Sequence, residues 1–159
     1  WGTDALAAVI HIISKQTEEK NLQTELEYGS FNSLKAAVSG GYAQSNWGLH
    51  GGVTGVDSGG SNISLQGDEK DGFENLTARF GLDNSWSEAI SSSVRFSHSD
   101  AMNEYDGTDF MVTGLPVDAD LWTERGLTTA MAQFRIKPEN SRWSSRFDYH
   151  YSDNKSENF

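Results

Sequence analysis

Apolar and polar residues alternate with a period of two through most of the chain beyond residue 21. In residues 22–29, for example, Leu22, Leu26 and Tyr28 share one face, and the residues on the other face are polar. Because successive side chains of a β-strand point to opposite sides, this pattern predicts strands. The predicted strands lie within residues 22–29, 33–43, 47–56, 73–82, 86–99, 121–136 and 141–153. The sequence therefore predicts an all-β fold, an antiparallel up-and-down meander of about seven strands.

The connections between these segments are of two kinds. Short turn signals occur at residues 44–46, 83–85 and 137–140, whereas residues 57–72 and 100–120 are long and polar. Transmembrane β-barrels have short turns at one rim and long loops at the other. The first connection, at residues 29–32, is also short and departs from this rhythm. The pattern predicts a partial transmembrane β-barrel, and a soluble antiparallel sheet is the alternative because periodicity does not say which face meets lipid.

The chemistry of the two faces favours the barrel. The predicted apolar faces carry aromatic residues near the segment ends, as in the aromatic girdles of membrane barrels, at Trp47, Phe73, Trp86, Trp143 and Tyr151. The opposite faces carry Ser, Thr, Gly and a few Arg, which a water-filled or plugged lumen accepts and a dry core does not.

Acidic residues gather in the two long loops. The first contains Gln66, Asp68, Glu69 and Asp71, and the second contains Glu104, Asp106, Asp109, Asp118 and Asp120. Adjacent hairpins place their loops at the same rim, and Ca²⁺ prefers carboxylate and carbonyl oxygens. Ordinary solvation of loops in an acidic protein is the competing interpretation.

Composition excludes some classes of function. The net charge is −11, which argues against binding to a nucleic-acid backbone. The chain has no Cys and no apolar run near the roughly 20 residues of a membrane-spanning helix. No signal peptide is present. The sequence starts and ends abruptly, so we expect it to be a piece of a longer protein.

No catalytic constellation is present in the sequence, so we expect no enzyme. The four histidines, at positions 11, 50, 98 and 150, are scattered, and no Gly-x-Ser-x-Gly motif occurs.

Residues 1–15 carry a distinctive motif. Val9 to Ile13 form a β-branched run typical of a strand, which on its own fits a soluble domain equally well. Together with Gly2-Thr3-Asp4-Ala5 and Ser14-Lys15, this stretch resembles the end of the plug domain of TonB-dependent outer-membrane receptors. Ala7-Ala8 stand where a glycine pair is common, and His11 stands where Asn is common. The resemblance implies a plug end and linker at residues 1–19 and the first strands of a barrel at residues 20–159.

Within this superfamily, residues 22–153 are most similar to the cobalamin receptors. The similarity lies in Gly29-Ser30-Phe31-Asn32, Asp71-Gly72-Phe73, Tyr105-Asp106 and Asp118-Ala119-Asp120. It implies that calcium binds the two loops through Glu69, Asp71, Asp106 and Asp118, with Asp68 and Asp120 as near neighbours. Glu69 stands where those receptors have Asp.

The resemblance implies part of a receptor in the bacterial outer membrane that imports a scarce nutrient, either cobalamin or a siderophore. It implies contact with outer-membrane lipid, and with the TonB complex through a part of the plug beyond this chain. A haem receptor would present His and Tyr in the long loops, which contain only Tyr105. A soluble β-sheet protein that binds calcium or a partner is the alternative from another class. An isolated sheet has two open edges, so we also expect self-association.

Overall fold

A computed structural model describes residues 20–159 apart from 63, 65–68, 110 and 112–113, and it does not describe the side chain of Pro116. The predicted strand at Val9–Ile13, the predicted plug segment 1–19 and Asp68 lie outside the described residues.

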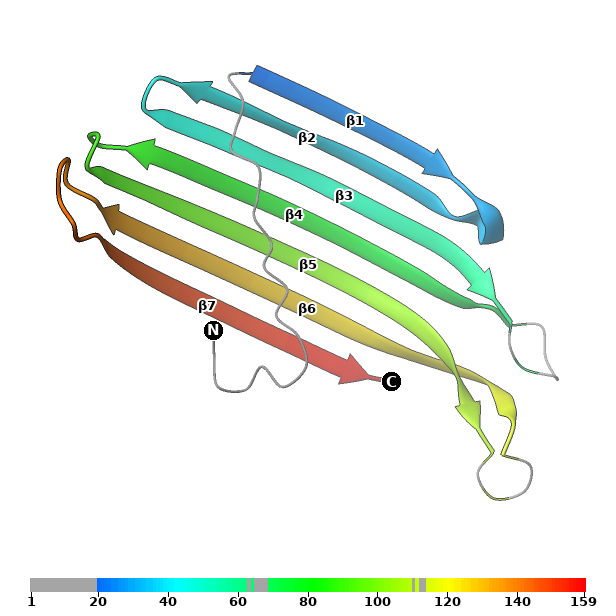
Figure 1. The fold of residues 1–159 in the computed structure, drawn as a ribbon. Helices are drawn as coiled ribbons and strands as arrows, with labels where there is room; N and C mark the ends of the chain where they lie inside the picture. Colours follow the sequence, from blue (N-terminus) through cyan, green and yellow to red (C-terminus); the bar gives the residue numbers. More distant parts are fainter. Residues whose placement is uncertain (1–19, 63, 65–68, 110, 112–113) are drawn as a thin grey trace.

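The described residues form one seven-stranded antiparallel sheet in which every strand pairs with its neighbours in sequence (Figure 1). A single turn of 3₁₀ helix, Ser30–Asn32, joins the first two strands. The strands are β1 (Lys20–Tyr28), β2 (Leu34–Gln44), β3 (Trp47–Ser61), β4 (Asp71–Ser85), β5 (Ile90–Thr108), β6 (Pro116–Ile136) and β7 (Ser145–Asn158). The predicted all-β meander is therefore confirmed, and the sheet is open because β1 and β7 are its edges.

The strands are longer than predicted at the end that carries the long loops. β3 continues to Ser61 and β4 begins at Asp71, while β5 and β6 extend to Thr108 and from Pro116. The predicted loops at 57–72 and 100–120 thus shorten to 62–70 and 109–115. The predicted turn at residues 83–85 is also wrong, because β4 continues to Ser85 and the turn follows at 86–89. Backbone pairing continues in these places through small and acidic residues, which carry no apolar alternation.

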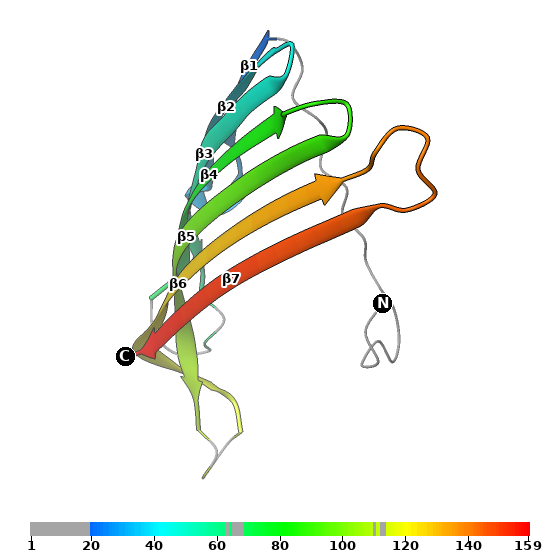
Figure 2. The ribbon, with the colours of Figure 1, turned by 90° about the vertical axis from the view of Figure 1, so that its left-hand side faces the viewer.

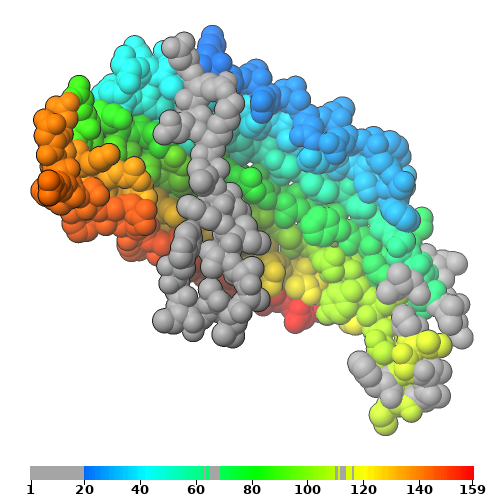
Figure 3. Space-filling view, viewed as in Figure 1, coloured from blue at the N-terminus to red at the C-terminus, as the bar shows by residue number. Residues whose placement is uncertain are grey.

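The sheet is one curved layer, as Figure 2 shows. In Figure 3, the strands follow one another in chain order across a single surface. No described hydrophobic side chain is buried, and Leu22 and Leu26 are 75% and 76% exposed. The described residues therefore contain no hydrophobic core, and the apolar side chains have no partner layer within them.

None of the described residues forms a helix long and apolar enough to span a membrane.

The strand register separates the side chains into two faces, because directly paired residues point to the same side. We call one the apolar face; one of its rows consists of Leu22, Gly40, Gly51, Phe80, Phe96, Ala130 and Tyr151. We call the other the polar face; one of its rows consists of Gln23, Ser39, Gly52, Arg79, Ser97, Thr129 and Ser152. Phe73 pairs with Asn103 and lies on the polar face, so its predicted place on the apolar face is wrong.

Apart from Met102 and Trp122, which lie on β5 and β6 towards the end of the sheet that carries the long loops, the side chains of the apolar face form an apolar band that crosses the sheet diagonally. We call this end of the sheet the loop end. Towards the loop end, the band extends to Tyr28 on β1 but only to Tyr151 on β7, and Tyr151 lies in the same row as Leu22. Its edge therefore shifts by the six residues from Leu22 to Tyr28 between β1 and β7. At about 3.3 Å per residue and about 4.8 Å per strand, this shift corresponds to a slope of about 35°. The opposite edge moves in the same direction, from Leu22 on β1 to Ile136 on β6.

Candidate functional site

The acidic residues singled out by the sequence lie at one end of the sheet. The β3–β4 and β5–β6 hairpins both end there, at the lower right of Figure 1. Glu69 lies two residues before β4, and Asp71 is the first residue of β4. Asp106 lies near the end of β5, and Asp118 lies near the start of β6.

A β-bulge built on Gly60 sets the place where β4 begins. The β3–β4 register shifts between Ser58 and Ser61, and Gly60 has a φ of 61°. A Cβ at this position would lie 1.6 Å from the carbonyl oxygen of Asp71. Only glycine adopts this backbone without a clash, so Gly60 fixes the position of Asp71 at the rim.

A second bulge lies beside Asp106. The β5–β6 register shifts between Tyr105 and Gly107. The backbone N–H of Ala119 donates to Asp106 Oδ1 across the strands at 3.4 Å. This long hydrogen bond links Asp106 to the segment that carries Asp118.

Glu104 connects the two hairpins directly. Its Oε2 accepts a hydrogen bond of 2.8 Å from the backbone N–H of Gly72. The sequence placed Glu104 among the acidic loop residues but gave it no role, because an acceptor for a backbone N–H leaves no motif. Glu104 holds the start of β4 against β5 and thereby brings Asp71 towards Asp106.

The predicted acidic residues influence one another electrostatically. Burial raises the pKa of Asp71, and the negative charges of Asp106, Glu104 and Asp118 raise it further. Burial also raises the pKa of Glu69, with smaller contributions from Asp120, Asp118, Asp106 and Asp71. Each cause favours the neutral acid, so ionisation of both groups is opposed by their surroundings.

Two carboxylate oxygens at this end of the sheet are buried without a hydrogen-bond partner. They are Asp106 Oδ2 and Asp118 Oδ1. A buried, unpaired carboxylate oxygen costs free energy, which a cation offsets when it binds there. This donor set of hard oxygens suits Ca²⁺.

The structure thus brings all four predicted residues into one electrostatically connected group. Among the described residues, however, no three His, Asp or Glu side chains are arranged to hold a metal ion together. A cation would therefore have to draw the two loops closer.

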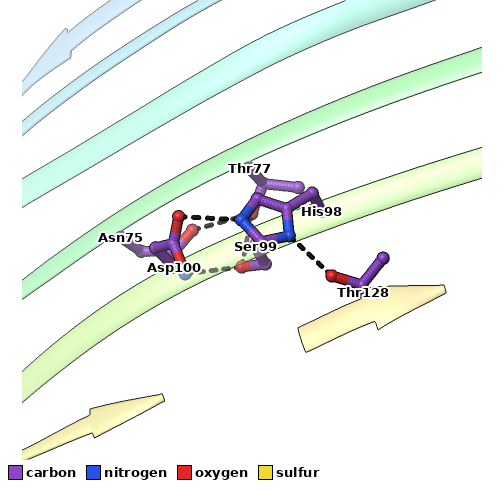
Figure 4. Close-up of polar contacts among 6 residues, drawn as sticks. All are labelled: Asn75, Thr77, His98, Ser99, Asp100 and Thr128. Atoms are coloured by element: carbon purple, nitrogen blue, oxygen red, sulfur yellow. Dashed lines mark hydrogen bonds and ion pairs between the residues drawn. The ribbon is translucent and has the colours of Figure 1, made fainter. Parts of the chain in front are cut away.

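A second polar cluster lies in the middle of the sheet (Figure 4). On the apolar face, His98 Nδ1 lies 2.8 Å from Thr128 Oγ1 and His98 Nε2 lies 2.9 Å from Asp100 Oδ2. These contacts have the spacing of a nucleophile, a base and an orienting acid. The Asp100 side chain is 65% exposed. All three residues lie in paired strands, where the backbone N–H groups form the hydrogen bonds between strands. We interpret the cluster as the polar end of the apolar band on β5 and β6.

No protein-family model, curated protein or solved structure matches this chain.

Proposed function

We propose that this sheet is part of the wall of a transmembrane β-barrel and that its apolar face contacts lipid. The observation that carries the proposal is the diagonal apolar band on a single-layered sheet whose described residues bury no hydrophobic side chain. Barrel strands tilt by about 35–45° from the membrane normal, so a band parallel to the membrane crosses such strands obliquely. The slope of about 35° derived from the register and the strand spacing falls in this range.

The alternative is a soluble sheet covered by a second protein layer. A layer that packs on a sheet would account for the apolar face but gives no reason for both edges of the band to shift in one direction. Lipid accounts for the apolar character and for the slope. The polar face, rich in Ser, Thr and Gly, is then the wall of an aqueous lumen.

The sequence motifs support a more specific proposal. The segment 2–15 and the four motifs at 29–32, 71–73, 105–106 and 118–120 support a TonB-dependent receptor of the bacterial outer membrane. On this basis the chain belongs to the uptake path of cobalamin or of a siderophore, and the TonB complex supplies the energy. The acidic rim binds Ca²⁺ through Glu69, Asp71, Asp106 and Asp118.

Insertion into lipid vesicles tests whether the sheet is part of a transmembrane barrel wall. Phe80→Lys places a charge in the middle of the apolar band, and Ser97→Lys places the same charge on the polar face of the next strand. A charge on the lipid face costs about 2–4 kcal/mol at mid-membrane, so we expect Phe80→Lys alone to lower the inserted fraction in a flotation assay. Equal losses from both variants would contradict the proposal.

Calorimetric titration with Ca²⁺ tests whether the acidic residues at the rim bind this ion. We expect binding to the unaltered chain and its loss in an Asp71→Ala, Asp106→Ala double variant. Asp57→Ala, Asp153→Ala removes the same charge from the apolar face and serves as the control. Absence of binding to the unaltered chain, or equal binding to both variants, would contradict a calcium site at the rim.

A further inference from the structure

Charged residues in the strands are sorted between the two faces. Among the residues paired in the strand register, the polar face carries six cationic side chains, Lys35, Arg79, Arg95, Arg125, Arg135 and Arg146, and five carboxylates, Glu25, Glu27, Asp71, Asp83 and Asp148. The apolar face has the reverse balance, with seven carboxylates, Asp57, Glu74, Asp100, Glu104, Glu124, Asp153 and Glu157, and two lysines, Lys20 and Lys155. An excess of cations over carboxylates on the polar face, in a chain of net charge −11, is not a consequence of composition.

Four of the five carboxylates of the polar face are already paired with three of its cations. Lys35 pairs with Glu25 and Glu27. Arg95 Nη2 lies 2.6 Å from Asp83 Oδ1, and Arg146 Nε lies 2.7 Å from Asp148 Oδ2. Asp71, at the loop end of β4, is the one carboxylate of this face outside these pairs, and the charge of Asp148 also acts on Arg135.

Three guanidinium groups remain, those of Arg79, Arg125 and Arg135. Within the described part of the chain, no residue accepts a hydrogen bond or forms an ion pair with them. Arg135 also stands directly opposite Arg146 on β7, a like-charged pair that opposes sheet formation. The single carboxylate of Asp148 interacts with both arginines, so the pair keeps a net positive charge that a further anion would neutralise.

The surroundings of these arginines suit small oxyanions. In its row of the sheet, Arg79 is flanked by Gly52 and Ser97, with Ser39 and Thr129 one strand further on each side. Near the turn end, an open hollow of about 1050 Å³ is lined in part by Ser91, Ser93, Arg95 and Arg135. Guanidinium groups bind carboxylates and phosphates through paired N–H donors, and hydroxyl groups add further donors.

The arginines follow the length of the polar face. Arg125 lies towards the loop end of β6 and Arg135 at its turn end, which are about 33 Å apart at the usual rise per residue. Arg79 and Arg95 lie between these levels on β4 and β5. Cationic side chains spaced along a lumen favour the passage of anions.

We propose that the polar face is a path for a small anionic solute that carries carboxylate or phosphate groups. This inference rests on the proposed function, in which the polar face lines the lumen, and it narrows the solute to an anion. Separate guanidinium groups with small hydroxyl side chains between them suit a solute that moves from one group to the next.

Side-chain NMR of the full chain, with inorganic phosphate and then citrate as probes, tests the path. We expect the Nε–H resonances of Arg79, Arg125 and Arg135 to shift and saturate. Arg142 in the β6–β7 turn, which is exposed and unpaired, is expected to shift only with ionic strength. Arg79→Gln and Arg135→Gln are each expected to weaken phosphate binding by about five-fold or more, and Arg142→Gln to leave it unchanged.

Equal shifts at all arginines, Arg142 included, would overturn the proposal, since they would show charge screening alone. Shifts with polyglutamate but with neither phosphate nor citrate would also overturn it, in favour of an acidic protein partner. The titration measures anion binding to the arginines of the polar face, and this measurement does not depend on whether the apolar face contacts lipid. A failure of the anion path is therefore distinguishable from a failure of the barrel wall.

Discussion

Gly60 is the residue on which the geometry of the acidic rim depends most. We expect Gly60→Ala to lower the free energy of unfolding by about 2–3 kcal/mol, because it combines a left-handed φ with a clash against the Asp71 carbonyl. Gly114→Ala is the control, since its φ is 67° but nothing lies within 4 Å of the added methyl group. We expect this control to cost about 1 kcal/mol. Chemical unfolding in detergent would measure both, and equal losses would contradict the role of the bulge.

The pKa of Asp71 gives a prediction about pH. Because burial and its acidic neighbours raise this pKa, the folded state binds more protons than the unfolded state above about pH 4. The contribution of Asp71 to stability is therefore full below that pH and is lost as the pH rises through the raised pKa. Bound Ca²⁺ favours the carboxylate and is expected to lower the pKa of Asp71.

Carboxyl NMR titration with and without Ca²⁺ would measure this effect. An Asp71 midpoint at the ordinary value in metal-free buffer would contradict the electrostatic description of the rim.

At the scale of elements, the contact between Glu104 and Gly72 couples two hairpins. Hydrogen bonds to charged groups contribute about 1.5–3 kcal/mol, so we expect Glu104→Ala to accelerate amide exchange of Gly72 by about ten-fold or more. Glu104→Gln keeps an acceptor oxygen and is expected to retain much of the protection. If Glu104→Ala leaves the exchange of Gly72 unchanged, the two hairpins are not coupled through this contact.

The sequence predicts elements well where side chains alternate and poorly where only the backbone pairs. Leu76, Phe80 and Leu82 mark β4 clearly, because each is followed by a residue of the opposite character. Residues 58–61 are Ser and Gly, so nothing in their side chains reveals that β3 continues to Ser61.

The candidate site is only partly readable from the sequence for the same reason. The four acidic residues can be chosen by type and by resemblance, but their relative positions depend on the bulges at Gly60 and between Tyr105 and Gly107. The contact of Glu104 with a backbone N–H has no sequence signal at all. The arginine path likewise needs the strand register, because it joins residues from different strands.

At the scale of the whole molecule, the two open edges determine how the sheet associates. β1 and β7 run in the same direction because an even number of antiparallel steps separates them. They cannot pair with each other antiparallel, and closure of an antiparallel barrel needs an odd number of further strands. Both edges also carry exposed apolar residues, including Leu22, Leu26 and Phe147.

We therefore expect this chain to self-associate in buffer without detergent. Sedimentation velocity with and without detergent would measure the effect, and detergent is expected to disperse the oligomers. A stable monomer in detergent-free buffer would contradict both the self-association and the lipid-facing role of the apolar face.

In a barrel wall, one face of the sheet meets lipid and the other meets water. Because the chain has no Cys, spin labels can be attached to single introduced cysteines in vesicle-bound protein. We expect labels at Leu76, Phe80 and Phe96 to be accessible to oxygen dissolved in the bilayer. Labels at the neighbouring positions Thr77, Arg79 and Ser97 are expected to be accessible to a water-soluble nickel complex. Alternation between these two patterns along β4 and β5 would support the barrel wall, and equal accessibility of both faces to the nickel complex would contradict it.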